Sequence, residues 1–468
     1  MATAAEPAAP DAGGDFRTEL LTLTRLAGPL VLAQLSQMGM GVADTIMAGR
    51  VSAAELAGVA LGGNLYFPML LFATGTVLAL TPTVAQLNGA AKQDAVGEVV
   101  RQALWIALFG GLGLALYLRS AEPLYQWFGI DPLAIPIAAR YLNATSYAAP
   151  ALLGYFVLRY LCEGMSWTRP AMVLGVAGLA LKIPLNLLFI YGEPRLGLPA
   201  LGGAGCGWAT AVIVWLQFLT LLVIVRRSHL RATGVFDRFS WPNLGAMLQL
   251  IKLGLPIGVT NSLEVALFSA TTLLVGTLSV SAVAAHQIAM NIGGLAFMIP
   301  SALGMAAAIR VGHNVGAERL AAARRSGWAA IVVAEAFALL AIAVMLIGGE
   351  RLTGLYSSES DVVETAAYLL LFVAGFQIFD AGQVACMGSL RGYKDTRIPM
   401  LFALLAYWLL GFPVARVLGL GGLGFNGLGV SGFWIGLILG LAVAAVCLFL
   451  RFERLSRRPD HIRGLALR

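Results

Sequence analysis

The sequence contains twelve long apolar runs, and these constrain its fold more than any other feature. A helix needs about 20 apolar residues to cross the hydrocarbon core of a bilayer. The runs cover residues 22–48, 54–82, 99–118, 138–161, 170–191, 203–225, 250–276, 280–308, 326–348, 363–389, 398–416 and 427–450. Only 12% of the 468 residues are charged, whereas a soluble chain carries about 25%. We therefore predict an all-α membrane protein with twelve transmembrane helices.

The two halves of the chain share a repeated pattern. Equivalent residues recur 227 positions apart: Pro29 with Pro256, Val84 with Val311, Gln86 with His313 and Gly89 with Gly316. A second set recurs 228 positions apart: Gly164 with Gly392, Thr168 with Thr396, Arg169 with Arg397 and Met172 with Met400. Internal repeats are the usual build of secondary transporters. Because six crossings is an even number, we predict two six-helix lobes related by a pseudo-twofold axis along the membrane normal.

The repeat also sets the expected domains. We expect an N-lobe over residues 17–226, a cytoplasmic linker over 227–245 and a C-lobe over 246–452, followed by a basic tail over 453–468. Residues 1–16 lack the basic segment and apolar run of a signal peptide, so we expect a disordered tail there. The four cysteines lie in or at the ends of apolar runs without metal-ligand spacing, which favours small core residues.

Basic residues predict the orientation of the chain in the membrane. Six of the 31 lie in the odd-numbered loops, three lie in or at the edges of helices, and the remaining 22 lie at the termini and in the even-numbered loops. Cytoplasmic segments carry the excess of Lys and Arg. We therefore expect cytoplasmic termini. Topology and anionic lipids account for the net charge of +7, so the charge gives no reason to predict nucleic-acid binding.

Three basic residues fall in or at the edge of helices: Arg159, Lys182 and Lys252. Lys252 begins the seventh helix and can snorkel to water, and Arg159 has Glu163 four residues on, a structural pair near the interface. Lys182 lies 13 residues beyond Arg169, about 20 Å deep at 1.5 Å per residue, so it needs a partner. Asp44 can supply one, and protonation of Asp44 would then break the pair and reshape the first half.

Glu264 and Asp380 are acids of the second half at comparable depth. Counted from Lys252 and Arg391, each lies about 16 to 18 Å from the cytoplasmic face, and an ionisable group at that depth is a candidate functional residue. Two neighbouring carboxylates in a low dielectric cannot both ionise cheaply, so one holds a proton near neutral pH or the pair shares a cation such as Na⁺. The alternative is a hydrogen-bonded helix contact, which we favour for Glu335.

A series of ordered motifs runs through all twelve helices: QMGMGVADTIMAG (37–49), PTVAQLNGA (82–90), EGMSWTRPAMV (163–173), KIPLNLLFIYG (182–192), GGAGCGWAT (202–210), EVALF (264–268), VAAHQIAMN (283–291), IRVGHNVG (309–316) and SLRGYKDTRIP (389–399). Together they resemble the multidrug and toxic compound extrusion family in its NorM-like bacterial branch. The resemblance implies a multidrug efflux antiporter in a bacterial inner membrane, which expels bulky organic cations, dyes and fluoroquinolone-like drugs in exchange for H⁺ or Na⁺. It also implies two lobes around a V-shaped cleft that opens alternately to each side.

The resemblance assigns roles to individual residues. The acids of the first, seventh and tenth helices and the polar residues near them match Asp44, Glu264, Asp380, Gln287, Asn186 and Thr210. Two positions depart from the family pattern: Lys182 replaces an asparagine, and Phe376 replaces a tyrosine. An ammonium at position 182 would repel Na⁺ and compete for Asp44, so we favour H⁺ coupling, with Na⁺ at Glu264 and Asp380 as the alternative. Methionines such as Met38 and Met290 suit a promiscuous drug-binding surface or an ordinary helical core.

Other functions remain as alternatives. A lipid or lipid-linked oligosaccharide flippase can share the two-lobe architecture, and a channel is compatible with buried charges. An enzyme or an ATP-driven pump is not predicted, because the sequence has no GxxxxGK[ST] motif and its four histidines are scattered. We expect no cofactor beyond the coupling ion. A single copy with an internal repeat can work as a monomer.

Overall fold

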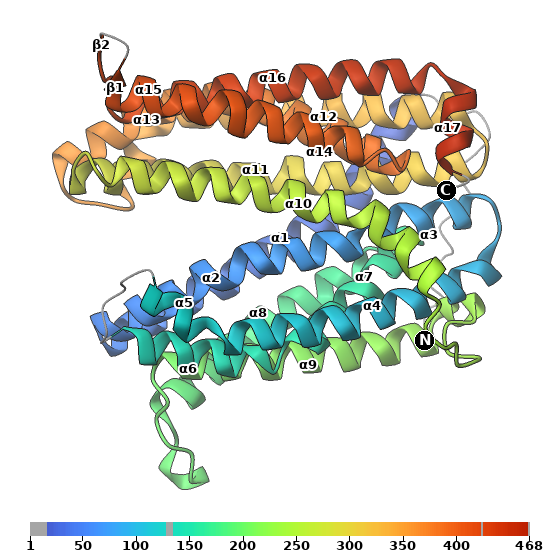
Figure 1. The fold of residues 1–468 in the computed structure, drawn as a ribbon, viewed down its shortest axis with the longest axis horizontal. Coiled ribbons are helices and arrows are strands. Elements are labelled where there is room, and N and C mark those ends of the chain that lie inside the picture. Colours follow the sequence, from blue (N-terminus) through green and yellow to red (C-terminus); the bar gives the residue numbers. More distant parts are fainter. Residues whose placement is uncertain (1–15, 128–133, 423–424, 467–468) are drawn as a thin grey trace.

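The computed structural model describes residues 16–127, 134–422 and 425–466, and these fold into two bundles of helices (Figure 1). The first bundle contains α1 (Phe16–Val51), α2 (Ala53–Leu78), α3 (Leu80–Gly89), α4 (Gln93–Arg119), α5 (Ala121–Trp127), α6 (Ile135–Ser146), α7 (Ala149–Gly164), α8 (Arg169–Tyr191), η1 (Pro194–Leu196) and α9 (Gly203–Arg227). The second contains α10 (Leu244–Val275), α11 (Val280–Gly316), α12 (Leu320–Gly354), α13 (Ser360–Gly392), α14 (Arg397–Ala403), η3 (Leu404–Gly411), α15 (Phe412–Leu420), α16 (Val430–Ser456) and α17 (Pro459–Ala466). The short segment η2 (His229–Thr233) joins them. The predicted all-α, two-lobe architecture is confirmed.

Eleven helical segments in the described part of the chain are long and apolar enough to cross a membrane, with α2 and α3 counted together and α14, η3 and α15 counted together. The twelfth predicted run, 138–161, corresponds to α6 and α7, which are separated by a turn at Tyr147 and Ala148. Pro150 lies in the first turn of α7, where a missing N–H costs nothing. The break shortens each helix but leaves the two in sequence across the same lobe.

Most helices extend beyond their apolar runs. For example, α11 continues to Gly316 and α12 begins at Leu320, outside the predicted limits of 308 and 326. Polar residues stabilise such ends, since the Asn243 side chain accepts hydrogen bonds from Gly245 N and Ala246 N at the start of α10 and thereby satisfies free backbone donors. The apolar run therefore marks the stretch that is long enough to cross the hydrocarbon core, and the helix itself is longer.

The segments expected to be a linker and a tail contain ordered structure. In the linker, Gly234 O accepts a hydrogen bond from Arg101, and Trp241 O accepts one from Gln102 of α4. In the C-terminal segment, α16 continues to Ser456 and α17 follows, with Ile462 buried in the core. Residues 1–15 of the predicted N-terminal tail lie outside the described residues.

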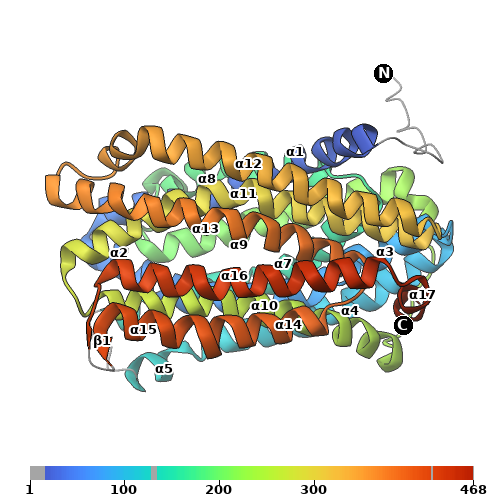
Figure 2. The ribbon, with the colours of Figure 1, turned by 90° about the horizontal axis from the view of Figure 1, so that it is seen from above.

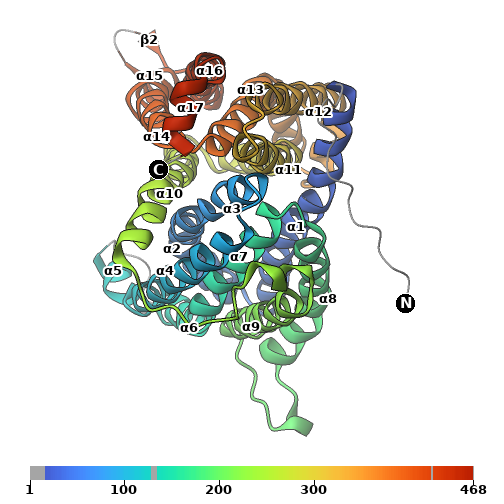
Figure 3. The same cartoon turned by 90° about the vertical axis from the view of Figure 1, so that its right-hand side faces the viewer.

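Helices of the second lobe run side by side along the long axis of the molecule, with α13 packed between α12 and α16 (Figure 2). A view along the helices shows this lobe on one side and α2 to α9 on the other (Figure 3). We call the end where α1 begins and α16 ends the terminal end. At the opposite end of the molecule, the strands β1 (Gly421–Gly422) and β2 (Phe425–Asn426) form a small antiparallel hairpin.

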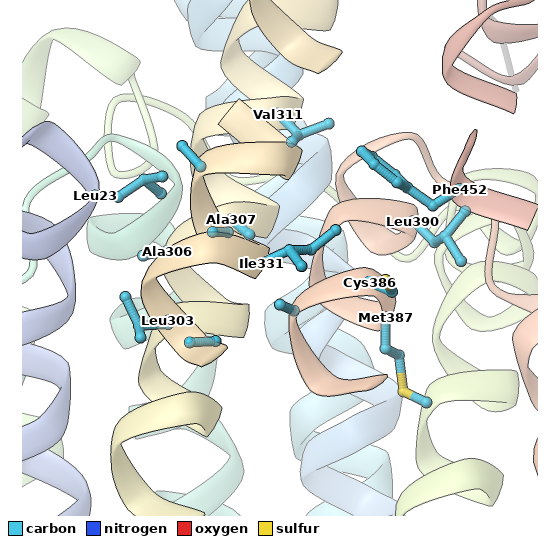
Figure 4. Close-up of a cluster of buried hydrophobic side chains, with 14 of the residues drawn as sticks. Leu23, Leu303, Ala306, Ala307, Val311, Ile331, Cys386, Met387, Leu390 and Phe452 are labelled. Atoms are coloured by element: carbon cyan, nitrogen blue, oxygen red, sulfur yellow. The ribbon is translucent and has the colours of Figure 1, made fainter. Parts of the chain in front are cut away.

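Part of the first helix of each lobe packs in the core of the other lobe. Leu23, Leu26 and Leu30 of α1 lie in one buried cluster with second-lobe residues such as Leu303 and Phe452 (Figure 4). Conversely, Leu250 of α10 belongs to a buried cluster of the first lobe. Small residues let the backbones approach closely, as is usual where helices pack in membranes. The two lobes are therefore interleaved at the terminal end.

Candidate functional site

The first candidate site surrounds Asp44 in the first lobe. Lys182 Nζ of α8 lies 2.9 Å from Asp44 Oδ1, and Asn186 Nδ2 donates a hydrogen bond to the same oxygen at 2.8 Å. The ammonium also donates to Thr210 Oγ1 at 2.5 Å and to Cys206 O at 3.1 Å. The predicted pairing of Asp44 with Lys182 is therefore present. Lys182 and Asn186 are almost fully buried, at 1% and 0% exposure.

Helical spacing and small residues assemble this site. Lys182 and Asn186 are four residues apart, so they share one face of α8, and Cys206 and Thr210 have the same relation on α9. Gly205 permits the close approach of α9 to α8, because a Cβ at this position would lie 2.6 Å from Ile190 N. The backbone carbonyl of Cys206 thus becomes available to the ammonium, a contact that no sequence pattern indicated.

The Lys182 ammonium lies among the oxygens of Asp44, Thr210 and Cys206. Carboxylate, hydroxyl and carbonyl oxygens are also the ligands that small hard cations take. A second cation at this position would meet the lysine charge at close range, where repulsion is strong. The arrangement can respond to protonation of Asp44, which would remove the charge that compensates Lys182.

The second candidate site contains Glu264 of α10 and Asp380 of α13. Asp380 is 2% exposed and its Oδ1 has no hydrogen-bond partner among the described residues. Glu264 is half-buried, and the two carboxyl groups interact electrostatically. Glu264 also interacts with the charge of Arg391. The structure thus brings together the two acids that the sequence placed at the same depth.

A π-helical segment positions additional polar groups beside these acids, and sequence reasoning missed them. Tyr407 of η3 is buried and interacts electrostatically with both Glu264 and Asp380. Its hydroxyl accepts a hydrogen bond from Gln383 Nε2 at 2.6 Å, and the next residue, Trp408, donates to Leu263 O at 3.1 Å. π-Helical turns are frequent at functional sites. The only available signal was a Tyr-Trp pair in an otherwise apolar run.

The remaining predicted residues lie outside these two clusters of contacts. Gln287 is exposed, whereas Met38 and Met290 are half-buried. Phe376 is buried and its ring lies 5.8 Å from that of Phe268 and 6.1 Å from that of Trp434, in edge-to-face arrangements. Phe376 therefore packs within the lobe one helical turn before Asp380.

In the stretches that the structure describes, no group of three or more His, Cys, Asp and Glu side chains lies close enough to hold a metal ion. Glu264 and Asp380 alone offer two carboxylates. A monovalent ion at that position would need further oxygens from hydroxyl, amide or backbone groups.

Comparison with known proteins identifies the family. A family model described as MatE matches residues 29–188 and 256–417, which include Asp44 and Lys182 of the first site and both acids of the second. The chain belongs to the MatE family. The matched segments follow the two lobes and leave out the linker between them.

Bacterial relatives of this MatE chain match it over nearly its whole length. It is 43% identical to the multidrug resistance protein PmpM of Pseudomonas aeruginosa over 95% of this chain and 93% of that protein. It is 41% identical to the multidrug resistance protein NorM of Vibrio vulnificus, over 96% and 98%, and 42% identical to MdtK of Yersinia pestis, over 95% and 97%. The chain is accordingly a MATE multidrug efflux transporter rather than an enzyme, and a multi-pass protein of the bacterial inner membrane.

Solved structures confirm the MatE fold. The eukaryotic MATE transporter AtDTX14 superposes with a TM-score of 0.83 at 23% identity, covering 96% of this chain and 99% of that one. The Vibrio cholerae transporter VcmN in its bent form gives a TM-score of 0.83 at 18% identity, covering 96% and 99%. At these identities the likeness concerns the fold alone.

Proposed function

We propose that this transporter is an antiporter that exports bulky organic cations, including dyes and fluoroquinolone-like drugs, in exchange for protons. The observation that carries the proposal is the position of the Lys182 ammonium among three oxygens of the first-lobe site. A fixed positive charge there disfavours a sodium ion. Protonation of Asp44 changes the charge of that site without a metal cation.

Exchange requires that the drug and the coupling ion each shift the same conformational equilibrium, because each binds one conformation more tightly than the other. A cationic drug near Asp380 would be held by negative charge, and a proton on that carboxylate would weaken the hold. Because Asp380 is buried and interacts electrostatically with Glu264, the pair cannot carry two negative charges cheaply. Protons and drugs thus bind alternately. Gln287, Phe376, Met38 and Met290 are proposed to line the drug-binding surface.

We propose that the terminal end is cytoplasmic, because Lys and Arg concentrate there and cytoplasmic segments carry this excess. The transporter then acts as a monomer in the lipid bilayer, since both repeats of the fold lie in one chain. Drug released at the opposite end would leave the cell.

Transport in everted membrane vesicles tests the coupling ion. A pH gradient alone should drive uptake of a fluorescent organic cation, and a Na⁺ gradient alone should not. Each gradient is collapsed separately with an ionophore as the control. Uptake that depends on Na⁺ alone would refute proton coupling.

Substitution of the buried acid tests its role. Asp380→Asn keeps the shape of the side chain but removes its charge, so dye efflux from cells should fall by at least about tenfold, the effect of about 1.4 kcal/mol in an energy barrier. Asp361→Asn, on the exposed first turn of the same helix, is the matched control and should transport normally. The amount of protein in the membrane is measured for both. Undiminished efflux by Asp380→Asn would show that this acid has only a structural role.

A further inference from the structure

Two residues of opposite charge occupy equivalent places in the two lobes. Glu163 lies near the end of α7 and Arg391 lies near the end of α13, 228 positions apart, which is the spacing of the glycines that follow them, Gly164 and Gly392. An exact copy would place like charges there. The inversion of charge puts an acid and a base at the same depth on opposite sides of the boundary between the lobes.

Only one of the two carboxylate oxygens of Glu163 accepts a hydrogen bond in the described part of the chain. The residue is fully buried, and its Oε1 accepts a hydrogen bond from Arg159 Nε at 2.6 Å. Its Oε2 has no hydrogen-bond partner among the described residues. A buried polar atom without a partner costs about 1–3 kcal/mol, so this oxygen needs a water molecule or a second donor.

Arg391 approaches from the other lobe. Its Nη2 donates to Asn261 Oδ1 at 3.1 Å and contacts Met387 Sδ at 3.2 Å, and its charge interacts with Glu264 of the second-lobe acid pair. The guanidinium has five N–H donors. It can therefore donate hydrogen bonds to Asn261 and to a further acceptor while its charge interacts with the acid pair.

Glu163 and Arg391 line the same small cavity between the lobes. Its volume is about 10 Å³, the space of a single water molecule. Its other walls come from both lobes: Leu78, Thr81, Pro82, Gly304, Met305 and Ala308. A water at this position could bridge the free carboxylate oxygen and the guanidinium.

We propose that Arg391 is a positioning residue that divides its charge between Glu264 in its own lobe and Glu163 across the boundary, and so links the ionisation of the acid pair to contact between the lobes. The proposal deepens the proposed function, because it concerns how the same acid pair is set for exchange. When the acid pair carries a negative charge, Arg391 neutralises it. When a proton or a drug neutralises the pair, the Arg391 charge acts mainly on Glu163.

The charged and titratable groups around this point come from five elements. They are Glu163, Arg159, Tyr155 and Tyr160 of α7, Glu264 of α10, Glu335 of α12, Arg391 and Asp380 of α13, and Tyr407 of η3. The cavity walls contributed by α2, α3 and α11 are uncharged. Arg391 thus interacts with Glu264 of its own lobe and lines the same cavity as Glu163 of the other lobe.

Opposite effects on the pH profile of transport follow from this arrangement. Arg391→Gln removes the positive charge beside Glu264, so the acid pair should keep its proton to higher pH. Glu163→Gln removes the competing acid, so the full charge of Arg391 acts on Glu264, which should lose its proton at lower pH. The expected shifts of the midpoint are about half to one pH unit, a three- to tenfold change in proton concentration.

The experiment measures pH-gradient-driven dye uptake into proteoliposomes, and dye binding to the purified full chain, over a series of pH values. Arg391→Gln should raise the midpoint and Glu163→Gln should lower it. The double variant should match Arg391→Gln, because Glu163 acts on the acid pair only through the charge of Arg391. Arg391→Lys should stay near the wild type. Asp361→Asn is the matched control, because this exposed acid in the first turn of α13 does not line the cavity. Shifts in the same direction, or no shift in either variant, would overturn the proposal.

Two further measurements apply if a variant fails to fold or if Na⁺ drives uptake. If a Gln variant fails to fold, judged by gel filtration and thermal unfolding, Glu163→Asp replaces Glu163→Gln and should lower the midpoint by a smaller amount. If wild-type uptake is driven by Na⁺ alone, the proposed coupling ion is wrong. The half-saturating Na⁺ concentration then reports on Arg391, and should fall in Arg391→Gln and rise in Glu163→Gln.

Discussion

Lys182 is the residue that most distinguishes the first-lobe site. Its ammonium contacts the oxygens of Asp44, Thr210 and Cys206, so Lys182→Asn would leave the Asp44 charge without compensation. Breaking a buried ion pair costs about 3–5 kcal/mol, and we expect a clear loss of thermal stability. Because the oxygens would then be free, added Na⁺ should restore part of that stability while added choline should not.

Thermal unfolding of the purified variant in each salt checks this prediction. Lys252→Asn removes the same charge from an exposed position on α10, and its unfolding temperature should be the same in Na⁺ and in choline. If the unfolding temperature of Lys182→Asn is the same in Na⁺ and in choline, the three oxygens do not form a cation site.

Residue-level prediction succeeded where a single charge in an apolar helix needs a partner. Depth alone paired Lys182 with Asp44, and the i,i+4 spacing of Arg159 and Glu163 gave a real ion pair at 2.6 Å. The sequence could not show that Glu163 and Arg391 line the same cavity, because helix depth does not determine which face of a helix meets the other lobe. Tyr407 was missed for the same reason, since only the π-helical turn brings it to the acids.

Two glycines at the terminal end allow α3 and α11 to meet. A Cβ on Gly89 would overlap the carbonyl oxygen of His313, and a Cβ on Gly316 would overlap that of Gln86. The pair is related by the internal repeat, so each lobe supplies one glycine to the same crossing. No side chain fits between these backbones.

We therefore expect Gly89→Ala and Gly316→Ala to force the lobes apart at the terminal end. Transport should fall by about tenfold or more, since overpacking typically costs about 1–3 kcal/mol. A cysteine introduced at Thr81, which is 2% exposed at the boundary, should become reactive towards a maleimide. Gly113→Ala is the control, because a Cβ there meets open space; labelling that is equal in all three proteins would contradict the prediction.

The elements themselves were predictable to different degrees. Apolar length gave the long helices such as α12, because a helix in lipid must satisfy its own backbone. It did not give the turn between α6 and α7, because the predicted run 138–161 passes through the polar residues Asn143, Thr145 and Ser146 just before the break. It also gave no sign of η3, whose residues, Leu404–Gly411, read as an ordinary apolar helix.

At the scale of the whole molecule, a buried ion pair joins the lobes. Arg310 of α11 donates to Glu19 of α1 through Nε at 2.9 Å and Nη2 at 2.7 Å, and Ser326 of α12 donates to the same carboxylate at 2.5 Å. Such bidentate pairs are strong and orient both partners. This contact holds the first helix of one lobe against two helices of the other.

Glu19→Gln should loosen this contact and favour separation of the lobes at the terminal end. Loss of one partner from a buried pair costs about 3–5 kcal/mol, so the unfolding temperature should fall and dye binding should weaken. Glu318→Gln, at an exposed turn near the same end, is the control. A reversed pair, Glu19→Arg with Arg310→Glu, should recover part of the stability, and equal loss in the single and reversed variants would argue against a direct pairing.

The interleaving of α1 and α10 has a consequence for how the chain is made. When synthesis has reached the end of the first lobe, the leucines at positions 23, 26 and 30 have no partner, because their cluster belongs to helices not yet translated. The first helix can therefore complete its packing only after the second lobe has been synthesised. Truncated or separately produced halves carry complementary unfinished surfaces, and a nonsense mutation in the linker would leave a fragment that membrane proteases can recognise as incomplete.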